Sequence, residues 1–498
     1  MTITQLTPII FGAVAAFVSV NWIYFKILQI AISKKLVDNP DARKLQKRPI
    51  PLVGGLAVFF GVLFGLMVAS MCHHILIPEI LHTRLFPILC AMGIMLYVGS
   101  LDDILGLSPK SRFIIEIAVV LILIFDTGMC VDTFHGMWGV NAFSWWLAVP
   151  LTVIAGVGII NAINMIDGVN GLSSGMCIVS SILFGTIFIK AQDIPNAVLA
   201  FTMAAALLPF YIHNVFGLKS RMFIGDAGTM VMGMLMTWFL ICMLSSKSLV
   251  SYYHAANGVN MIAMSLAVLS VPVFDTLRVM TMRIMKKKNP FKPDKTHLHH
   301  VFVNVGVSHF ITSTIEIFLG ILIFSIWCIS VCCGVGLDVQ LYIVIAASVI
   351  CVWGTYAFMR YQISHQTELL HHITGYSIRT HLGRTRWWKN ITNWLDKPGD
   401  YSELEMDATT NISQYVEEHI KGINSEINYK EYDRKLILEY LKGKAEVHVD
   451  DIIANSGADK LRVYPILFEE VMDGFVVVVK ENINGSPIIV SLKGEKNI

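Results

Sequence analysis

The stretch WWLAVPLTVIAGVGIINAINMIDGVNGL, residues 145–172, decides the fold class of this chain. The run at 145–160 is almost entirely apolar, which is typical of a helix that crosses a bilayer core about 30 Å thick. Three asparagines and an aspartate follow it directly. Charged side chains at membrane depth are costly to bury, so they usually mark a functional site. The stretch therefore predicts a membrane-spanning helix with a polar site at its end.

The composition of the whole chain agrees with a membrane protein. Of its 498 residues, 55% are hydrophobic and 15% are charged, whereas about a quarter of residues in soluble domains are charged. Apolar runs that predict spans lie at about 7–31, 52–71, 86–101, 113–128, 144–164, 172–190, 195–214, 223–244, 259–279, 308–334 and 338–360. We therefore predict an all-α polytopic membrane protein with about eleven transmembrane helices.

Basic residues predict the orientation of these helices. They concentrate in alternate loops, at 34–48, 110–112, 219–221 and 283–295. Cytoplasmic loops are richer in Lys and Arg, which places these four loops in the cytoplasm. The first apolar run has no basic residue before it and no cleavage site after it, which predicts a retained anchor with its N-terminus outside. An odd number of spans then places the C-terminus in the cytoplasm.

The hydropathy falls after residue 360, and we predict three regions. A transmembrane domain covers residues 1–360, a basic interfacial linker 361–400, and a cytoplasmic domain 401–498. The linker contains SIRTHLGRTRWWKN, residues 377–390, whose basic and tryptophan side chains are typical of a segment at the lipid headgroups. A solvated linker is an equally good interpretation of the same segment.

The last domain has an element order that resembles a winged helix: helix, short strand, two helices and a hairpin around Asn-Gly. Winged helices often bind DNA, but residues 430–496 hold ten Lys and Arg against twelve Asp and Glu. That balance has the wrong sign for a surface that follows phosphates. We therefore predict an α+β, winged-helix-like domain with no nucleic-acid partner and with a protein-contact or regulatory role.

Five polar motifs lie in the loops that the orientation places in the cytoplasm. They are DNPDARKLQKRPIPLVGG from residue 38, VGSLDDILGLSPKSR from 98, NAINMIDGVNGL from 161, RMFIGDAGTM from 221 and KKKNPFKPDKTHLHH from 286. Carboxylate and amide oxygens without thiolates suit Mg²⁺ or Mn²⁺. Lysines, arginines and histidines in the same place suit a polyphosphate substrate. The combination is typical of phosphoryl transfer.

Each motif has a simpler interpretation when it is taken alone. Asp102, Asp103 and Asp226 could each cap a helix. Asp275 could be the ion-pair partner of Arg278, three residues later. Independent caps would not need to share one membrane face, so their coincidence favours a common site.

The motifs also resemble a known family. RPIPLVGG, DD, NAINMIDG, FIGDAG, VPVFDTLRV and NPFKPDKTHLHH, spread over about residues 30–305, resemble in content and order the polyprenyl-phosphate N-acetylhexosamine-1-phosphate transferases. The nearest branch is that of the bacterial undecaprenyl-phosphate N-acetylglucosamine-1-phosphate transferases. The resemblance implies transfer of N-acetylglucosamine 1-phosphate from UDP-N-acetylglucosamine to undecaprenyl phosphate, with Mg²⁺ or Mn²⁺, in the bacterial inner membrane. It leaves a homodimer open.

The resemblance also assigns roles to single residues. Asp102, Asp103 and Asp167 are implied to be catalytic, and Asp226 with Asp103 is implied to hold the metal. The implied substrate-binding residues are Lys44, Asn161, Asn164, Asn170, Lys295, His297, His299 and His300. Asn170 departs from the family pattern DGxDG, in which this position is an aspartate. Asparagine keeps an acceptor oxygen but carries no charge, so a carboxylate role is excluded here.

Other hypotheses stay open at this stage. A transporter or lipid-binding scaffold would place ionisable groups near the middle of the membrane, and the lack of an internal repeat weakens the transporter. A degenerate transferase, with Asn170 as the mark of lost catalysis, would use its tail for binding. Under the transferase hypothesis, the donor could be another UDP-N-acetylhexosamine, and the reaction could follow a two-step route through a carboxylate nucleophile.

Overall fold

The structure is a computed structural model that describes residues 3–38, 50–76, 81–290, 296–365 and 385–396 and, with short gaps, residues 429–492. The chain divides into two compact units, residues 1–405 and 406–498. The predicted site residues Lys44 and Lys295 lie outside the described residues.

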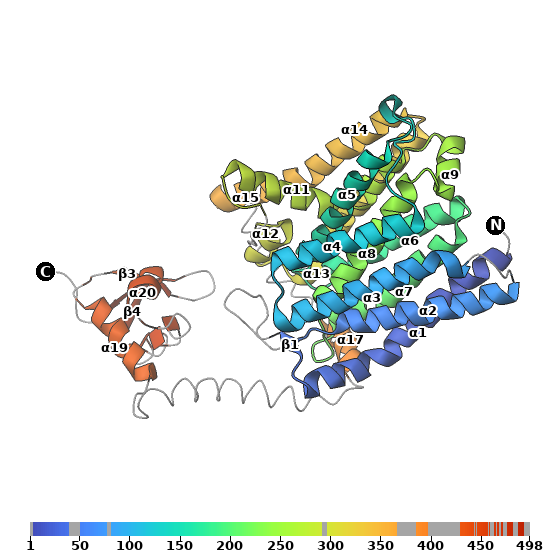
Figure 1. Cartoon of the computed structure of the whole chain (residues 1–498). Helices are drawn as coiled ribbons and strands as arrows, with labels where there is room; N and C mark the ends of the chain where they lie inside the picture. The colour runs from blue at the N-terminus through green and yellow to red at the C-terminus, as the bar shows by residue number, and fades with distance from the viewer. Residues whose placement is uncertain are drawn as a thin grey trace. The chain divides into compact units, whose positions relative to one another are not determined.

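The first unit is a bundle of helices (Figure 1). Its helices are α1 (Ile3–Ser33), α2 (Gly54–Leu76), α3 (Leu81–Leu105), α4 (Pro109–Thr127), η1 (Met137–Gly139), α5 (Trp145–Met165), α6 (Leu172–Lys190), α7 (Ile194–Phe216), α8 (Gly225–Leu244), α9 (Leu249–Asn257), α10 (Met261–Val268), α11 (Ser270–Met285), α12 (Leu298–Asn304), α13 (His309–Cys332), α14 (Leu337–Ser348), η2 (Val349–Gly354), α15 (Thr355–His365) and α17 (Arg386–Asp396). Two short strands, β1 (Val37–Asp38) and β2 (Ile50–Pro51), pair in antiparallel fashion.

The described helices confirm a multi-pass membrane protein. Nine of them are long and apolar enough to cross a membrane, or ten if the bent pair α10–α11 counts as one span. The expected eleven spans are therefore too many by this measure. The difference is α4, at the predicted span 113–128, whose charged residues Lys110, Arg112, Glu116 and Asp126 exceed what such a helix carries. Two of these charges belong to the site described below.

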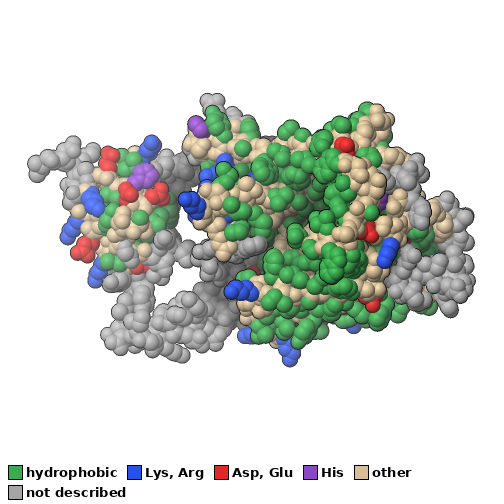
Figure 2. Space-filling model, turned by 45° about the horizontal axis from the view of Figure 1, so that its top comes forward, with side chains coloured by type: hydrophobic (Ala, Val, Ile, Leu, Met, Phe, Trp, Pro, Cys, Tyr) green, Lys and Arg blue, Asp and Glu red, His purple; other side chains and the backbone are tan. Residues whose placement is uncertain are grey.

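The outer surface of the bundle is apolar. Trp146 is 87% exposed, and Ile154 and Ile350 are each 71% exposed. Figure 2 shows a broad hydrophobic surface over this unit, with few charged side chains on the face in view. In a soluble protein such a surface would be unstable in water, whereas in a bilayer it contacts lipid tails. Helices satisfy their own backbone hydrogen bonds, which is why they can cross the lipid.

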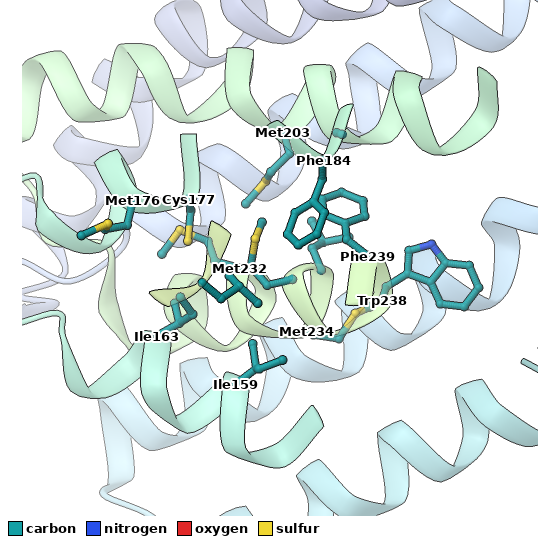
Figure 3. Close-up of a cluster of buried hydrophobic side chains, with 14 of the residues drawn as sticks. Ile159, Ile163, Met176, Cys177, Phe184, Met203, Met232, Met234, Trp238 and Phe239 are labelled. Carbon is teal, nitrogen blue, oxygen red and sulfur yellow. The ribbon is translucent and has the colours of Figure 1, made fainter. Parts of the chain in front are cut away.

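Helix α8 lies at the centre of the bundle. It packs against α2, α3, α5, α6 and α10, and its apolar stretch is entirely buried. Beyond its first turn its sequence is almost entirely apolar, as expected for a helix with neighbours on every side. Figure 3 shows Met232, Met234, Trp238 and Phe239 of α8 among Phe184 and other side chains of the neighbouring helices. This packing fixes the position of the first turn of α8, which carries Asp226.

The predicted span at 259–279 is broken in the structure. Its two halves, α10 and α11, meet at an angle of 79°. Pro272, in the first turn of α11, has no N–H to donate to the carbonyl of Val268, which favours a bend near this position. The freed carbonyl accepts a hydrogen bond from Ser180 Oγ at 3.4 Å. The bend directs α11 and the following histidine segment toward the polar end of the bundle.

The second unit is a small α+β domain. Its described elements are α19 (Tyr429–Leu441), β3 (Val447–His448), α20 (Val449–Asn455), β4 (Val476–Glu481) and β5 (Pro487–Leu492). The strands form an antiparallel sheet in the order β3-β5-β4. The predicted first helix, short strand, second helix and hairpin strands are therefore present, and the predicted third helix lies largely outside the described residues. The winged-helix assignment stays a prediction.

Candidate active site

The polar motifs meet at one end of the bundle, around the first turn of α8. Asp103, in the last turn of α3, accepts hydrogen bonds from the backbone N–H of Asp226 at 2.9 Å and of Ala227 at 3.1 Å. The first N–H groups of an α-helix have no partner within the helix. Asp103 therefore caps α8 from another helix, and its negative charge faces the positive end of the α8 dipole.

Gly225 allows this close approach. Its φ of +71° lies in the left-handed region, where residues with a side chain are strained. A Cβ at this position would also lie 2.5 Å from Asp103 Oδ2. The motif FIGDAG thus requires glycine before Asp226 because both the backbone conformation and the neighbouring carboxylate exclude a side chain.

The side chain of Asp226 is held from α5. Asn164, in the last turn of α5, donates from its side-chain amide to Asp226 Oδ1 and to Thr229 Oγ1, the second at 2.7 Å. The Asp226 side chain nevertheless stays 35% exposed. Two predicted site residues from distant motifs are thus direct neighbours, and the carboxylate remains open to a ligand.

Arg112 in α4 is a site residue that our sequence analysis missed. Its Nη1 lies 3.3 Å from Asp102 Oδ2 and 3.8 Å from Asp226 Oδ1. One guanidinium therefore bridges the DD motif and the FIGDAG motif, and it places a positive charge between two carboxylates. The sequence signal for this role was the spacing of Arg112 and Glu116, two opposite charges one helical turn apart at the start of an apolar run.

Glu116 holds Arg112 in place. This fully buried carboxylate accepts a hydrogen bond from Arg112 Nε at 3.1 Å. Its other oxygen accepts from the side-chain amide of Asn161, which also donates to the carbonyl of Val157 at 2.9 Å. Asn161 therefore supports the residue that orients Arg112, and its predicted contact with substrate stays a prediction.

Asp167 lies in the loop between α5 and α6. Its carboxylate accepts a hydrogen bond from the Ser173 hydroxyl. Burial raises the pKa of Asp167 to about 7, against the hydrogen bond from Ser173 and together with the nearby charge of Asp226. A carboxyl group with a pKa near neutrality can both take up and release a proton at physiological pH.

The histidine segment is organised by Asp275 of α11. The Asp275 carboxylate accepts from Arg278 Nη2 at 2.7 Å and lies 2.7 Å from His297 Nδ1. It also accepts from the backbone N–H of Leu298, at the start of α12. The ion pair expected from the spacing of Asp275 and Arg278 is therefore present, and it has the additional role of fixing His297.

His299 packs directly against the loop of Asp167. A Cβ on Gly168 would lie 2.5 Å from His299 Nε2, so the glycine of MIDG makes room for the imidazole. The ring lies 4.3 Å from that of His300 and 5.7 Å from that of His297, between ring centroids. Burial lowers the pKa of His299 well below its usual value, and the neighbouring imidazoles act in the same direction. Burial therefore disfavours the charged form of this imidazole.

Asn170 contributes through its backbone. Its N–H donates to His309 Nδ1 at 3.4 Å, and the next N–H, of Gly171, donates to Asn214 Oδ1 at 2.7 Å. These contacts fix the turn of DGVNG without a carboxylate at position 170. The RPIPLVGG motif joins the same end of the bundle, because Phe223 N–H donates to the carbonyl of Pro51 at 2.8 Å.

The donor set of this end of the bundle fits Mg²⁺. Mg²⁺ is usually held by one or two carboxylates, with the remaining positions taken by water and substrate phosphates. Asp226 offers a partly exposed carboxylate, whereas both oxygens of Asp103 already accept backbone N–H groups. In the described part of the chain, no three His, Cys, Asp or Glu side chains form a metal-binding group. Both ligand assignments stay predictions.

The comparisons with known proteins identify the family of this chain. Residues 85–244 match the family described as glycosyl transferase family 4. The chain is 32% identical over 301 residues to the probable undecaprenyl-phosphate N-acetylglucosaminyl 1-phosphate transferase of Bacillus subtilis (strain 168), an overlap of 60% of this chain and 78% of that protein.

Two further relatives have names of the same kind. The chain is 30% identical over 290 residues to the undecaprenyl-phosphate alpha-N-acetylglucosaminyl 1-phosphate transferase of Yersinia pestis, or 57% of this chain and 73% of the relative. The enzyme of that name from Escherichia coli (strain K12) is 30% identical over 300 residues, or 59% and 76%.

The apolar helices and these relatives together define a multi-pass membrane enzyme of the sugar-1-phosphate transferase class. The chain belongs to the polyprenyl-phosphate N-acetylhexosamine-1-phosphate transferase family, which confirms the resemblance seen in the sequence.

Proposed function

We propose that this protein transfers N-acetylglucosamine 1-phosphate from UDP-N-acetylglucosamine to undecaprenyl phosphate, with release of UMP. The observation that carries the proposal is the cluster at the start of α8. There Asp226, held by Asn164 and capped by Asp103, faces Arg112 at 3.8 Å. This is an arrangement for a metal-bound pyrophosphate with a cation beside it. The names of the relatives support the choice of lipid and sugar.

In the proposed reaction, an oxygen of the lipid phosphate attacks the phosphorus atom that bears the sugar. The bond from this phosphorus to the oxygen shared with UMP breaks, and its electron pair leaves with UMP. Mg²⁺ or Mn²⁺, when bound, supplies charge neutralisation on the pyrophosphate. Arg112 places a second positive charge near the phosphates, where charge builds up in the transition state.

Asp167 is our candidate for the proton transfer. A phosphate monoester has a second pKa of about 6, so part of the lipid phosphate carries a proton at neutral pH. The pKa of Asp167, raised to about 7 mainly by burial, allows its carboxylate to take that proton. Asp102, which faces Arg112 at 3.3 Å, together with Asp103, is proposed to orient the attacking phosphate.

We place this end of the bundle at the cytoplasmic face of a bacterial inner membrane. Support comes from Lys34, Lys35, Lys110 and Lys219, which lie at the helix ends and in the connecting segments that the positive-inside rule assigns to the cytoplasm. A water-soluble nucleotide sugar and a phosphate anchored in the lipid can meet at such a surface. The lipid chain would lie against the apolar spans, and both headgroups would lie among the polar loops.

The decisive experiment measures UMP release by the full-length protein in membranes. UDP-N-acetylglucosamine, undecaprenyl phosphate and Mg²⁺ are each omitted in turn, and EDTA is added in a further reaction. We expect UMP only when all three are present and no UMP with EDTA. UDP-N-acetylgalactosamine in parallel decides between sugars. Absence of UMP with both donors, from protein that remains folded, would contradict the proposal and favour a scaffold without catalysis.

A further inference from the structure

Helix α17 packs against the site end of the first unit. Trp388 lies with its ring centroid 4.7 Å from that of Phe216 and 5.4 Å from that of Phe310. Thr392 Oγ1 donates to the carbonyl of Phe216 at 2.8 Å. These contacts are spaced by one helical turn, so one face of α17 is docked on the end of α7 and the beginning of α13.

Asp396, the last residue of α17, binds the loop between α7 and α8, residues 217–224. Its carboxylate accepts from the backbone N–H of Leu218 at 3.3 Å, of Lys219 at 3.0 Å and of Ser220 at 2.9 Å, and from Ser220 Oγ at 2.7 Å. Three successive N–H groups that converge on one carboxylate form an anion-binding turn. The chain fills this turn with its own side chain, and hydrogen bonds to a charged group are stronger than neutral ones.

The residues around this turn are fixed from other helices. Ser220 Oγ also lies 3.1 Å from His213 Nδ1, and the Ser220 carbonyl accepts from Tyr24 Oη at 2.7 Å. The Arg221 guanidinium donates to the carbonyl of Val215 at 3.5 Å. Burial lowers the pKa of Arg221, against the charge of Asp396. The carboxylate thus stabilises both the loop backbone and a poorly solvated cation.

The α7–α8 loop continues directly into the site. The carbonyl of Met222 accepts a hydrogen bond from Asn214 Nδ2 at 2.7 Å. Oδ1 of the same asparagine accepts a hydrogen bond from the backbone N–H of Gly171, in the DGVNG turn. Phe223 pairs with Pro51 and Gly54 of the RPIPLVGG motif. The loop then turns at Gly225 and begins α8 at the candidate metal ligand. One short segment therefore joins three of the site motifs.

A second path leads from α17 to the site through α13. Phe310, which packs on Trp388, follows His309, and His309 Nδ1 accepts from the N–H of Asn170. Helix α17 thus supports two of the segments that hold the site, although no residue of α17 belongs to the site motifs.

We propose that Asp396 is a positioning residue for the transferase site, and that α17 fixes the α7–α8 loop so that Asp226 meets its partners. The inference rests on the proposed function only for its kinetic test. It extends the functional part of the chain beyond the motifs to helix α17, which lies between the last membrane-spanning helix and the second unit in the sequence.

The test compares Asp396→Ala, Asp396→Asn and Asp338→Asn in the full-length protein. Asp338 is the matched control, because it also accepts a backbone N–H, that of Trp138 at 2.9 Å, but at the opposite end of the bundle. We expect kcat of Asp396→Ala to fall about tenfold with a smaller change in KM, since a displaced metal ligand weakens the transition state most. Asp396→Asn should be intermediate, and Asp338→Asn unchanged.

Hydrogen exchange provides a readout that does not depend on turnover. In Asp396→Ala we expect faster exchange at residues 218–220 that spreads to residues 222–226. Unchanged kcat, or faster exchange confined to 218–220, would overturn the positioning role. If the wild-type protein releases no UMP, the proposed function fails. The positioning role of Asp396 is then tested only by whether faster hydrogen exchange in Asp396→Ala spreads to residues 222–226. If Asp396→Ala does not fold, Asp396→Asn and Ser220→Ala replace it under the same criteria.

Discussion

The two ends of the helix bundle use aspartates in different ways. At the end away from the site, Asp132 accepts from the backbone N–H and the hydroxyl of Ser246, at 2.7 and 2.8 Å. Asp193 accepts from the backbone and side chain of Asn196 within the first turn of α7. Each of these carboxylates caps or fastens one segment, as the simpler interpretation of an isolated aspartate predicts.

At the site end the carboxylates are connected to one another. Asp102 and Asp226 share Arg112, and Asp103 caps the helix that carries Asp226. An arrangement that brings several like charges together is costly unless cations and N–H groups offset the repulsion. A single aspartate is therefore weak evidence for a functional site, whereas aspartates from separate helices around one guanidinium indicate a catalytic site. Four changes test this contrast.

The largest effect is expected at Asp226. Asp226→Asn keeps the size of the side chain but removes the charge that would hold a metal, so UMP release should fall by about 10³-fold. The thermal unfolding midpoint of the purified protein should change little. Asp132→Asn, at the other end, should retain wild-type turnover. Equal losses in the two variants would remove the contrast between the ends.

Arg112 should rank second. Arg112→Met removes the cation between Asp102 and Asp226, and kcat should fall by about 10²-fold because charge in the transition state is no longer offset. Arg112→Lys should recover part of the rate, since lysine keeps the charge but loses the planar fork. Steady-state kinetics of UMP release measure both. A Met variant with wild-type kcat would assign Arg112 to structure alone.

Gly225 and Gly334 form a matched pair of glycines. Both have positive φ, +71° and +69°, but a Cβ meets Asp103 Oδ2 at 2.5 Å in the first and nothing within 4 Å in the second. Gly225→Ala should lower activity at least tenfold, because it displaces Asp103 in addition to straining the backbone. Gly334→Ala should lower only the unfolding temperature. Activity assays and thermal unfolding on both variants separate strain from displacement.

The smallest effect is expected in the pH dependence. The pKa of Asp167 is raised to about 7, mainly by burial, so below this pH its carboxyl holds a proton and cannot act as a base. Activity should therefore rise about fourfold from pH 6.5 to pH 8. Asp167→Asn should lose this rise together with most of the rate. A rise that persists unchanged in the Asn variant would assign the titration to another group.

The raised pKa of Asp167 should also make the stability of the folded protein depend on pH, because the folded and unfolded states bind this proton differently. A carboxyl whose folded pKa lies above its ordinary value favours the folded state most below that ordinary value. Its contribution is lost as the pH rises through about 7. Asp167→Asn should therefore flatten the pH dependence of unfolding between about pH 4 and 7. A variant that keeps the wild-type slope would contradict the burial of this carboxyl.

Much of the fold follows from hydropathy. The runs at 172–190 and 223–244 correspond closely to α6 and α8, because a span must satisfy its backbone within one helix. Hydropathy alone did not show that 259–279 breaks near Pro272. It also did not show that the run at 113–128 begins in a charged segment whose Arg112 faces the site. The break depends on the missing N–H of Pro272, which hydropathy does not register, and the role of Arg112 depends on what lies beside the helix.

The site divides in the same way. The residue types could be read from the chain alone: carboxylates, amides, histidines and glycines occur in the order of a known family, at the ends of apolar runs. Which atoms meet became visible with the packing of the helices, which places Arg112 between two aspartates and Asp396 on the α7–α8 loop. The chemical type of each side chain is fixed by the sequence. Hydrogen bonds between residues 176 positions apart, such as Asp396 and Ser220, form only once the helices have packed.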